Sequence, residues 1–333
     1  MVPHASEESF RTLFEPHRRA ITLHSYRMLG SLQEAEEIVQ ETLLRAWQRQ
    51  DDVRSTSATR AWLYRIATNA CLDLLKTRNR RAMPHLVAPS THTAPQPGAP
   101  VDERLWLEPA PDTLLEVTDD AARQPEARVS LRESIGLAFV TALQFLSPKQ
   151  RAALILVDVL GWSPQETADL LETSVFSVNS LLQRARKGVE ARRGDDATAQ
   201  SSSPEDAAVL RRYIAMWESG DLDAFAVLLA DDARLSMPPQ PEWFAGREAV
   251  GRFLATMLAA PREYRFLRVG ANGGPALAVY SRPKASNEAY QAAGITWFSI
   301  RGGRVVEMTR FTSTKLFPLF GLAGHLPSNA PST

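Results

Sequence analysis

Apolar positions recur at helical spacing through residues 1–83, and the pattern predicts that this stretch is entirely helical. One helix begins at the capping box Ser31-Leu32-Gln33-Glu34, in which the serine and glutamate side chains each satisfy a free backbone N–H group. A second helix is predicted over about 58–78, with an apolar face turned to a core.

The same periodicity returns over residues 128–193, where the helix boundaries are clear. Ser147-Pro148-Lys149-Gln150 and Ser163-Pro164-Gln165-Glu166 are capping boxes with proline at the first helical position, where its missing N–H costs nothing. Gly161 ends the helix between them, and a third helix is predicted over about 175–191. A short helix, a tight turn and a basic amphipathic helix form a helix-turn-helix pattern.

Residues 204–333 have a different pattern, in which helices precede strands. The helices are expected over about 205–218, 221–230 and 247–258, and the strands over 264–270, 276–282, 293–300 and 304–312. Gly302-Gly303 between the last two strands is a two-residue hairpin signal. This segment is therefore predicted to be a separate α+β domain.

Polar stretches separate these parts. Residues 84–127 contain eight prolines among Ser, Thr and acidic residues, so they predict an extended acidic linker. Trp106 and Leu107 interrupt it, either as a chance aromatic residue in a loop or as a short docking segment against a flanking domain. The predicted fold is multidomain, with two all-α domains and one α+β domain, and its parts are 1–83, a linker over 84–127, 128–193, a Ser-rich linker over 194–203, and 204–333.

Composition excludes several classes of protein. The 333 residues carry 38 Lys+Arg against 38 Asp+Glu, and the single cysteine, Cys71, cannot form an intramolecular disulfide. No apolar run approaches the ~18 residues of a transmembrane helix, so we expect a cytoplasmic protein without a membrane partner. The six histidines and one cysteine lack metal-ligand spacing, and no phosphate-binding glycine loop occurs. Neither a metal nor a cofactor is expected.

Basic residues are concentrated on two predicted helices although the total charge is balanced. On the 58–78 helix, Trp62, Arg65, Asn69 and Lys76 form one stripe that suits single-stranded nucleic acid, whose bases stack on aromatic rings. The side of the 175–191 helix that faces away from its apolar residues is polar and cationic, as a helix entering the major groove requires. Its residues are Ser177, Asn179, Ser180, Gln183, Arg184, Arg186 and Lys187.

Three motifs resemble those of a known family. Residues 34–47, EAEEIVQETLLRAW, resemble region 2.2 of the extracytoplasmic-function (ECF) sigma factors of bacterial RNA polymerase. Residues 59–73, TRAWLYRIATNACLD, look like regions 2.3 and 2.4 of these factors, and residues 146–186 look like region 4. Order and spacing agree, and the resemblance covers about residues 8–190.

The resemblance implies how the chain acts in transcription initiation. The clamp coiled coil of core polymerase would bind a surface formed by Glu37, Gln40, Glu41, Leu44 and Trp47. Arg60, Trp62, Arg65, Asn69 and Lys76 would help to melt the -10 element and would bind its single strand. Asn69 matches the position that contacts a flipped-out base in the family. The seven polar residues of the 175–191 helix would bind the -35 duplex, and region 4 would also touch the polymerase flap. Many relatives carry arginine where this chain has Asn179.

Residues 204–333 resemble the SnoaL-like branch of the nuclear-transport-factor-2 (NTF2) fold, a cone of curved sheet with helices over its mouth. In sigma factors with such an extension, it tunes activity in cis, which implies contact with the sigma domains or the linker; 106–111 looks like the docking segment of those proteins. The Asp-Gly-Gly-Gly-Lys motif of one well-known group is absent. A pocket in this domain would be lined by Trp217, Phe225, Trp243, Phe253, Tyr280, Trp297 and Phe311.

Two other functions compete with a sigma factor regulated in cis. One is a SnoaL-like isomerase or cyclase with a DNA-binding appendage, which would need an acid–base pair in the cone. His325 is the only histidine after residue 92, and Asp231 and Asp232 suit a solvated turn, so no enzyme activity is expected. The other is a ligand-controlled helix-turn-helix regulator, which leaves the 34–47 motif unexplained.

Overall fold

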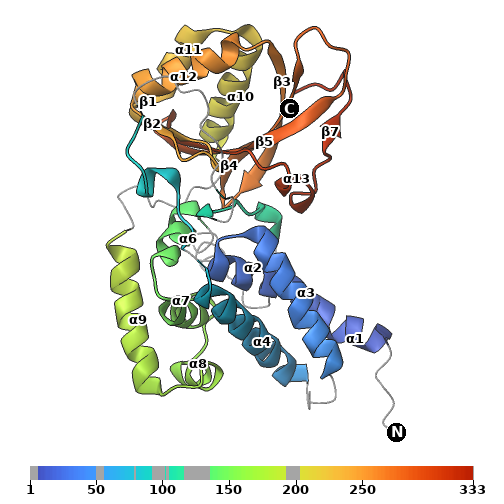
Figure 1. The fold of residues 1–333 in the computed structure, drawn as a ribbon, viewed down its shortest axis with the longest axis vertical. Helices are drawn as coiled ribbons and strands as arrows, with labels where there is room; N and C mark the ends of the chain where they lie inside the picture. Colours follow the sequence, from blue (N-terminus) through green and yellow to red (C-terminus); the bar gives the residue numbers. More distant parts are fainter. Residues whose placement is uncertain are drawn as a thin grey trace. The chain divides into compact units, whose positions relative to one another are not determined.

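The computed structural model divides the chain into two compact units (Figure 1). A helical unit comprises residues 1–81 and 113–198, and a sheet-containing unit comprises residues 82–112 and 199–333. The structure describes residues 7–49, 56–78, 80–91, 102, 105–115, 136–192 and 203–332. None of the helices in these stretches has the length and apolarity needed to cross a membrane.

The first half of the helical unit surrounds one almost fully buried helix. This helix, α2, spans Arg18–Leu29, and every residue from Ile21 onward is buried. Ser31 caps the next helix by accepting a hydrogen bond from the backbone N–H of Glu34 (3.1 Å), which is the serine half of the predicted capping box. The Glu34 carboxylate forms an ion pair with Arg81 (2.8 Å). The other helices of this half are α1 (Glu7–Phe14), η1 (Glu15–His17), α3 (Leu32–Gln48) and α4 (Thr56–Lys76).

The second half of the helical unit contains the predicted helix-turn-helix. Both capping boxes form, at Ser147 and at Ser163, and each fixes the start of a helix. Ser174 caps the following helix by accepting from the N–H of Ser177 (3.2 Å). The elements are α6 (Leu137–Gln144), α7 (Pro148–Leu154), the π-helical turn η7 (Ile155–Val159), α8 (Pro164–Leu170) and α9 (Val175–Glu190).

One apolar core runs through both halves of the helical unit, and a buried arginine joins them. The Arg151 guanidinium on α7 donates to the carbonyl oxygen of Met28 at the end of α2. It also donates to Gln144 Oε1 (2.7 Å) and to the Leu146 carbonyl oxygen (3.3 Å). Burial lowers the pKa of Arg151 to about 10, so the group is still a cation at neutral pH. These bonds satisfy a charge that would otherwise be costly to bury.

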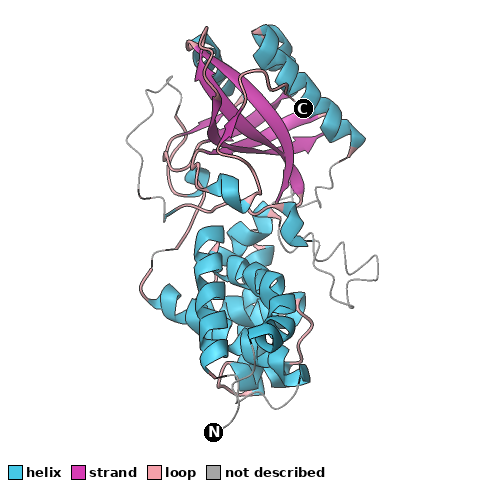
Figure 2. Ribbon diagram, turned by 90° about the vertical axis from the view of Figure 1, so that its right-hand side faces the viewer, coloured by secondary structure: helices cyan, strands magenta, loops and turns pink. Residues whose placement is uncertain are grey.

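The second unit is an α+β domain with one curved sheet (Figure 2). The strand order is β2-β1-β6-β5-β4-β3, with β1 parallel to β6, the other neighbours antiparallel, and β7 paired to β5. Gly302 and Gly303 both have positive φ in the β5–β6 turn, as the hairpin signal predicts. The elements are α10 (Pro204–Ser219), α11 (Leu222–Leu228), β1 (Leu229–Ser236), β2 (Trp243–Ala245), α12 (Arg247–Ala259), β3 (Arg262–Ala271), β4 (Gly274–Pro283), β5 (Tyr290–Arg301), β6 (Arg304–Phe311), α13 (Leu316–Leu319) and β7 (His325–Leu326).

The seven aromatic residues expected to line one pocket do not lie together. Side chains alternate between the two faces of a strand. Phe298 packs under the helices, so Trp297, its neighbour in the chain, points to the opposite face of the sheet. Trp217, Phe225 and Phe253 belong to the core between helices and sheet. The strand residues on the opposite face are Trp243, Tyr280, Trp297 and Phe311.

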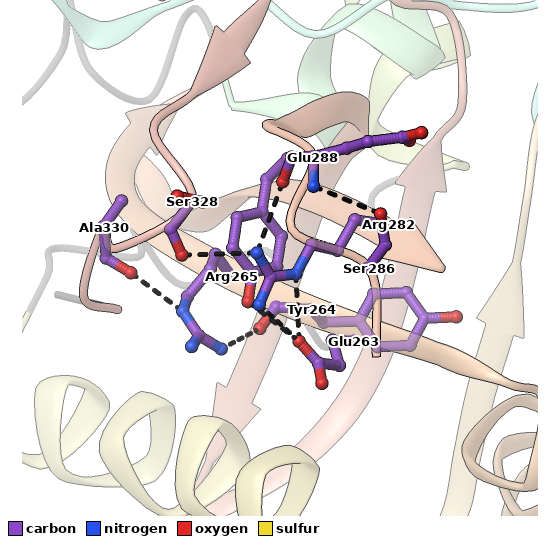
Figure 3. Close-up of polar contacts among 9 residues, drawn as sticks. Glu263, Tyr264, Arg265, Arg282, Ser286, Glu288, Ser328 and Ala330 are labelled. Atoms are coloured by element: carbon purple, nitrogen blue, oxygen red, sulfur yellow. Dashed lines mark hydrogen bonds and ion pairs between the residues drawn. The ribbon is translucent and has the colours of Figure 1, made fainter. Parts of the chain in front are cut away.

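Paired arginines hold the C-terminal segment against the sheet (Figure 3). Arg282 donates from Nε and Nη2 to Glu263 Oε2 (3.0 and 2.9 Å), and from Nη1 to the Ser328 carbonyl oxygen (3.3 Å). The guanidinium groups of Arg265 and Arg282 lie over the Tyr290 ring, at 4.8 and 4.2 Å from its centroid. The hydrogen bonds from Arg282 hold the pKa of the Glu263 carboxyl below its usual range. The cluster therefore keeps a carboxylate charged while fixing the segment after β7.

Candidate nucleic-acid interface

A mixed aromatic and polar stripe runs along α4, and its residues lie at the predicted helical spacing. Trp62, Arg65, Asn69 and Lys76, called the α4 stripe, fall within about 60° of one another at 3.6 residues per turn. Arg65, Asn69 and Lys76 are exposed, while Trp62 is half-buried with its ring 6.2 Å from that of Phe14. The stripe thus combines a fixed aromatic face with an amide and two cations, the groups that hold and stack single-stranded bases.

Trp62 and Arg65 of the α4 stripe border a cleft of about 550 Å³ within the helical unit. Its other side is formed by α8 and the turn before it, with Trp162 and Asp169 among the lining residues. Arg65 Nη2 donates to the Asp169 carbonyl oxygen (3.4 Å), and the Tyr64 ring lies 5.6 Å from that of Trp162. Arg60, which is off the stripe, lines the same cleft and lies over the Tyr64 ring at 5.8 Å. Of the residues predicted to bind the -10 element, Arg60, Trp62 and Arg65 thus face the helix-turn-helix.

Lys76 forms an ion pair at the exposed end of the α4 stripe. Its Nζ lies 2.8 Å from Asp73 Oδ1, and this hydrogen bond lowers the pKa of the Asp73 carboxyl. Both side chains are more than two-thirds exposed, and water screens such a pair strongly. Lys76 is therefore free to exchange this partner for a phosphate.

The outward side of α9 carries most of the predicted duplex-binding residues. Its inward side is buried at Val178, Leu182, Ala185 and Val189, as the apolar spacing predicts. We call the predicted outward set the recognition face; its exposed residues are Asn179, Gln183, Arg184, Arg186 and Lys187, and its half-buried residues are Ser177 and Ser180.

Four residues of the recognition face, Ser177, Ser180, Arg184 and Arg186, have hydrogen-bond partners within the helical unit. Ser177 Oγ lies 2.9 Å from Ser174 Oγ in the helix cap. Arg184 bonds to Ser180, from Nε to the carbonyl oxygen and from Nη2 to Oγ, both at 3.2 Å. Arg186 donates from Nε and Nη2 to the two oxygens of Asp158 (2.9 and 2.6 Å), and this contact raises the pKa of Arg186. Arg186 thereby orients α9, whereas Lys187 and Gln183 project from it.

The exposed side of α3 combines acidic and large apolar groups. Glu37, Gln40, Glu41, Leu44 and Trp47, called the α3 face, are all exposed and lie on one side of the helix. Leu44 is 58% and Trp47 37% exposed, and at a spacing of three residues the two side chains are neighbours on the helix surface. The face therefore has the composition of a protein-binding surface, and its residues are those that the sequence predicts for core polymerase.

In the second unit, the linker residues 105–112 dock on the β3–β4 hairpin. Ala110 N–H donates to Asn272 Oδ1 and Asn272 N–H donates to the Ala110 carbonyl oxygen, both at 2.9 Å. Gly273 N–H donates to Asp112 Oδ1 (2.7 Å). A Cβ at Gly270 would lie 2.3 Å from Asp112 Oδ2, so glycine is needed for this close approach. We call this contact the linker clamp, and it confirms a docked segment here.

A second linker segment, residues 82–91, lies on the same unit. Trp243 Nε1 donates to the Ala88 carbonyl oxygen (2.7 Å), and Thr91 N–H donates to the Trp243 carbonyl oxygen (2.8 Å). His85 Nδ1 lies 3.9 Å from Glu307, but burial, the larger influence, lowers the pKa of His85. The described part of the acidic linker is thus folded against the α+β domain, because Trp106, Leu107 and Ala110 are buried there.

Sequence reasoning did not identify the residues that hold the linker. Asn272 and Gly273 adopt positive φ (52° and 73°), and an Asn-Gly pair between strands is a signal for this turn. Nothing local, however, signals that the Asn272 side chain bonds a backbone 162 residues away.

A helical unit with a helix-turn-helix and two faces predicted to bind nucleic acid, followed by an α+β unit with a docked linker, is the architecture of a promoter-binding initiation factor with an accessory domain. Family models match Sigma-70 region 2 at residues 13–81, Sigma-70 region 4 at 136–188 and the SnoaL-like domain at 210–308. ECF RNA polymerase sigma factor SigG of Mycobacterium tuberculosis is 44% identical over 319 residues, covering 94% of this chain and 83% of the relative. The chain belongs to the ECF sigma factor family.

A second relative and a solved structure extend this likeness to the whole chain. ECF RNA polymerase sigma factor SigJ of M. tuberculosis is 29% identical over 306 residues, covering 88% of each chain. The crystal structure of SigJ superposes with a TM-score of 0.57 at 25% identity, covering 95% of this chain and 99% of the other. The order of the sigma regions and the SnoaL-like extension is therefore shared.

Proposed function

We propose that this ECF sigma factor binds core polymerase through the α3 face, single-stranded -10 DNA through the α4 stripe and Arg60, and duplex -35 DNA through the recognition face. The observation that carries the -10 assignment is the exposed Asn69 amide, which lies on the same side of α4 as Trp62 and Arg65. A ring for stacking, an amide for base edges and a cation for phosphate are the three groups that unpaired DNA requires.

Promoter binding requires the helical unit to open. The -10 and -35 elements lie ~25 base pairs apart, which is about 85 Å along duplex DNA. Arg65 on the α4 stripe, however, contacts Asp169 of α8 at 3.4 Å. This packing supports a closed state before initiation, in which the Trp62–Arg65 end of the α4 stripe lies against the helix-turn-helix while Asn69 and Lys76 stay exposed. Polymerase binding would draw the two halves apart.

The α+β unit regulates the sigma factor in cis through the linker. The support for this step is the linker clamp, in which Asn272 and Gly273 bind residues 110–112. A linker held in this way is withheld from any path through the polymerase. The resemblance to sigma factors implies that the acidic linker threads the polymerase toward the RNA exit path, so the clamp must open before the linker takes that path.

The α+β unit acts as a regulator and not as an enzyme. Asp231 lies on β1, exposed, and pairs with Arg247 (2.8 Å), and Asp232 next to it is also exposed. His325 is exposed on β7. These groups face water and do not line an enclosed, water-excluded site of the kind that proton transfer uses, which supports a regulatory role.

Asn69→Ala tests the assignment of the α4 stripe. We expect the variant to bind core polymerase as the wild type does and to form fewer open complexes, because the amide that reads an unpaired base is lost. Permanganate reactivity of promoter thymines measures opening, and fluorescence anisotropy measures polymerase binding. Asn287→Ala, an exposed asparagine of the other unit, is the matched control. Equal loss of binding and opening would contradict the assignment.

A further inference from the structure

One large apolar side chain on α9 is unexplained by packing. Phe176 is 83% exposed, the highest value among the large hydrophobic side chains that the structure describes. Burial of apolar area is what makes a phenylalanine stabilise a fold, and this ring buries almost none. Its place on the helix therefore calls for a function outside the folded monomer.

Phe176 lies on the line of α9 that points directly away from the core. Residues 4, 7 and 11 positions further on return to the same side of a helix of 3.6 residues per turn. For Phe176 these are Ser180, Gln183 and Lys187, all in the recognition face. Phe176 is also in the first turn, two residues after the cap at Ser174. The N-terminal turn of a recognition helix is the part that meets base edges.

Only one base edge in the major groove suits a phenyl ring. Thymine presents a C5-methyl group there, whereas the other major-groove edges present hydrogen-bond donors and acceptors. Residues of the recognition face read the polar groups, and none of them offers an apolar surface of comparable size. The Phe176 ring therefore complements the thymine methyl group, and Ser180 next to it complements the polar edge of the same base.

We propose that Phe176 contacts the C5-methyl group of a thymine in the upstream promoter duplex and is a specificity-determining residue of α9. This inference rests on the proposed binding of duplex DNA by the recognition face. Loss of the buried contact with one methyl group lowers the affinity for DNA by about fourfold. Phe176→Ala should therefore reduce discrimination at a single thymine while leaving the phosphate contacts of α9 intact.

The test begins with duplex DNA that carries a randomised upstream element, selected on holoenzyme assembled from core polymerase and the full chain. Each thymine of the selected element is then replaced in turn by deoxyuridine, which lacks only the methyl group. We expect wild-type holoenzyme to lose about fourfold in affinity at one thymine. The Phe176→Ala holoenzyme should bind the thymine and uracil duplexes equally well. Val227→Ala, which removes a 61% exposed side chain from α11, should discriminate as the wild type does.

The outcomes separate this inference from the function on which it rests. If wild-type holoenzyme selects no upstream element, the duplex role of the recognition face fails, and this inference falls with it. If an element is selected but both proteins lose the same affinity on deoxyuridine, Phe176 does not read a methyl group. A variant that assembles poorly with core polymerase but keeps the methyl discrimination would assign the ring to a polymerase contact, which also overturns the inference.

Discussion

The linker clamp predicts a specific consequence for substitution of Asn272. Asn272 is 3% exposed, has φ of +52° and makes two reciprocal bonds with Ala110, whose N–H is fully buried. Asn272→Gly keeps the backbone bond and suits the left-handed conformation, so it removes only the side-chain acceptor. Asn272→Ala removes the same acceptor and adds backbone strain, because a Cβ is disfavoured at that φ.

The structure sets the size of the effect. Leaving the buried Ala110 N–H without a partner costs about 1–3 kcal/mol. The equilibrium between the docked and released linker should therefore shift by about 5- to 150-fold in Asn272→Gly. Asn272→Ala should shift it further. Gly270→Ala is an independent route to the same release, because its Cβ would displace the Asp112 carboxylate from Gly273.

Amide hydrogen exchange on the full chain measures this equilibrium directly. The amides of residues 105–112 should exchange about 5- to 150-fold faster in Asn272→Gly, whereas amides in the centre of β5 should be unchanged. Asn287→Gly, at an exposed position in the same unit, is the matched control. Unchanged exchange at Ala110 in Asn272→Gly would refute the clamp, and unchanged run-off transcription despite faster exchange would refute its regulatory role.

Arg151→Met should destabilise the helical unit by about 3 kcal/mol, because several buried acceptors lose a charged donor. Urea unfolding followed by tryptophan fluorescence measures this loss of stability, and an unchanged midpoint would contradict the prediction. Acid should destabilise the chain through His24, since burial first and Arg27 second lower its pKa to about 3, so the folded state binds fewer protons than the unfolded state. Stability should fall by about 1.4 kcal/mol per pH unit from about pH 6.5 toward pH 3, and His24→Gln should flatten this slope in acid-unfolding curves. Arg184→Gln and Lys187→Gln should each reduce the slope of log affinity for duplex against log salt by about 1, and an equal slope would remove the residue from the phosphate contacts.

The sequence allowed accurate prediction of the helical unit because its signals are local. A capping box needs only four consecutive residues, so Ser147 and Ser163 mark their helices without knowledge of the rest of the fold. The spacing of Val178 and Leu182 likewise fixes which side of α9 is buried. The residues of the α4 stripe and the recognition face follow from the same rule, whereas those of the α3 face come from the resemblance to sigma factors, because spacing alone places Trp47 with the apolar residues.

The α+β unit was less predictable because partners distant in sequence decide its elements. Residues 229–236 begin with Leu-Ala-Asp-Asp, which lacks the alternation of a half-buried strand, and they form β1 by pairing in parallel with β6. The aromatic content of β5 predicts burial but not which face of the sheet each ring occupies, so Trp297 and Phe298 could not be separated. The burial of Trp106 was foreseeable, but its position against Ala82 was not.

The linker clamp also bears on how far the two DNA-reading halves can separate. From Arg81 to Leu137, where α6 begins, a free chain of ~55 residues would reach about 180 Å. With residues 82–91 and 105–112 docked on the α+β unit, the ~25 residues from Asp112 to Leu137 can contribute at most about 80 Å. That reach is close to the ~85 Å between the two promoter elements. Docking therefore shortens the linker to about the distance between the two elements. Its release in Asn272→Gly should lengthen the linker and ease engagement of both elements at once.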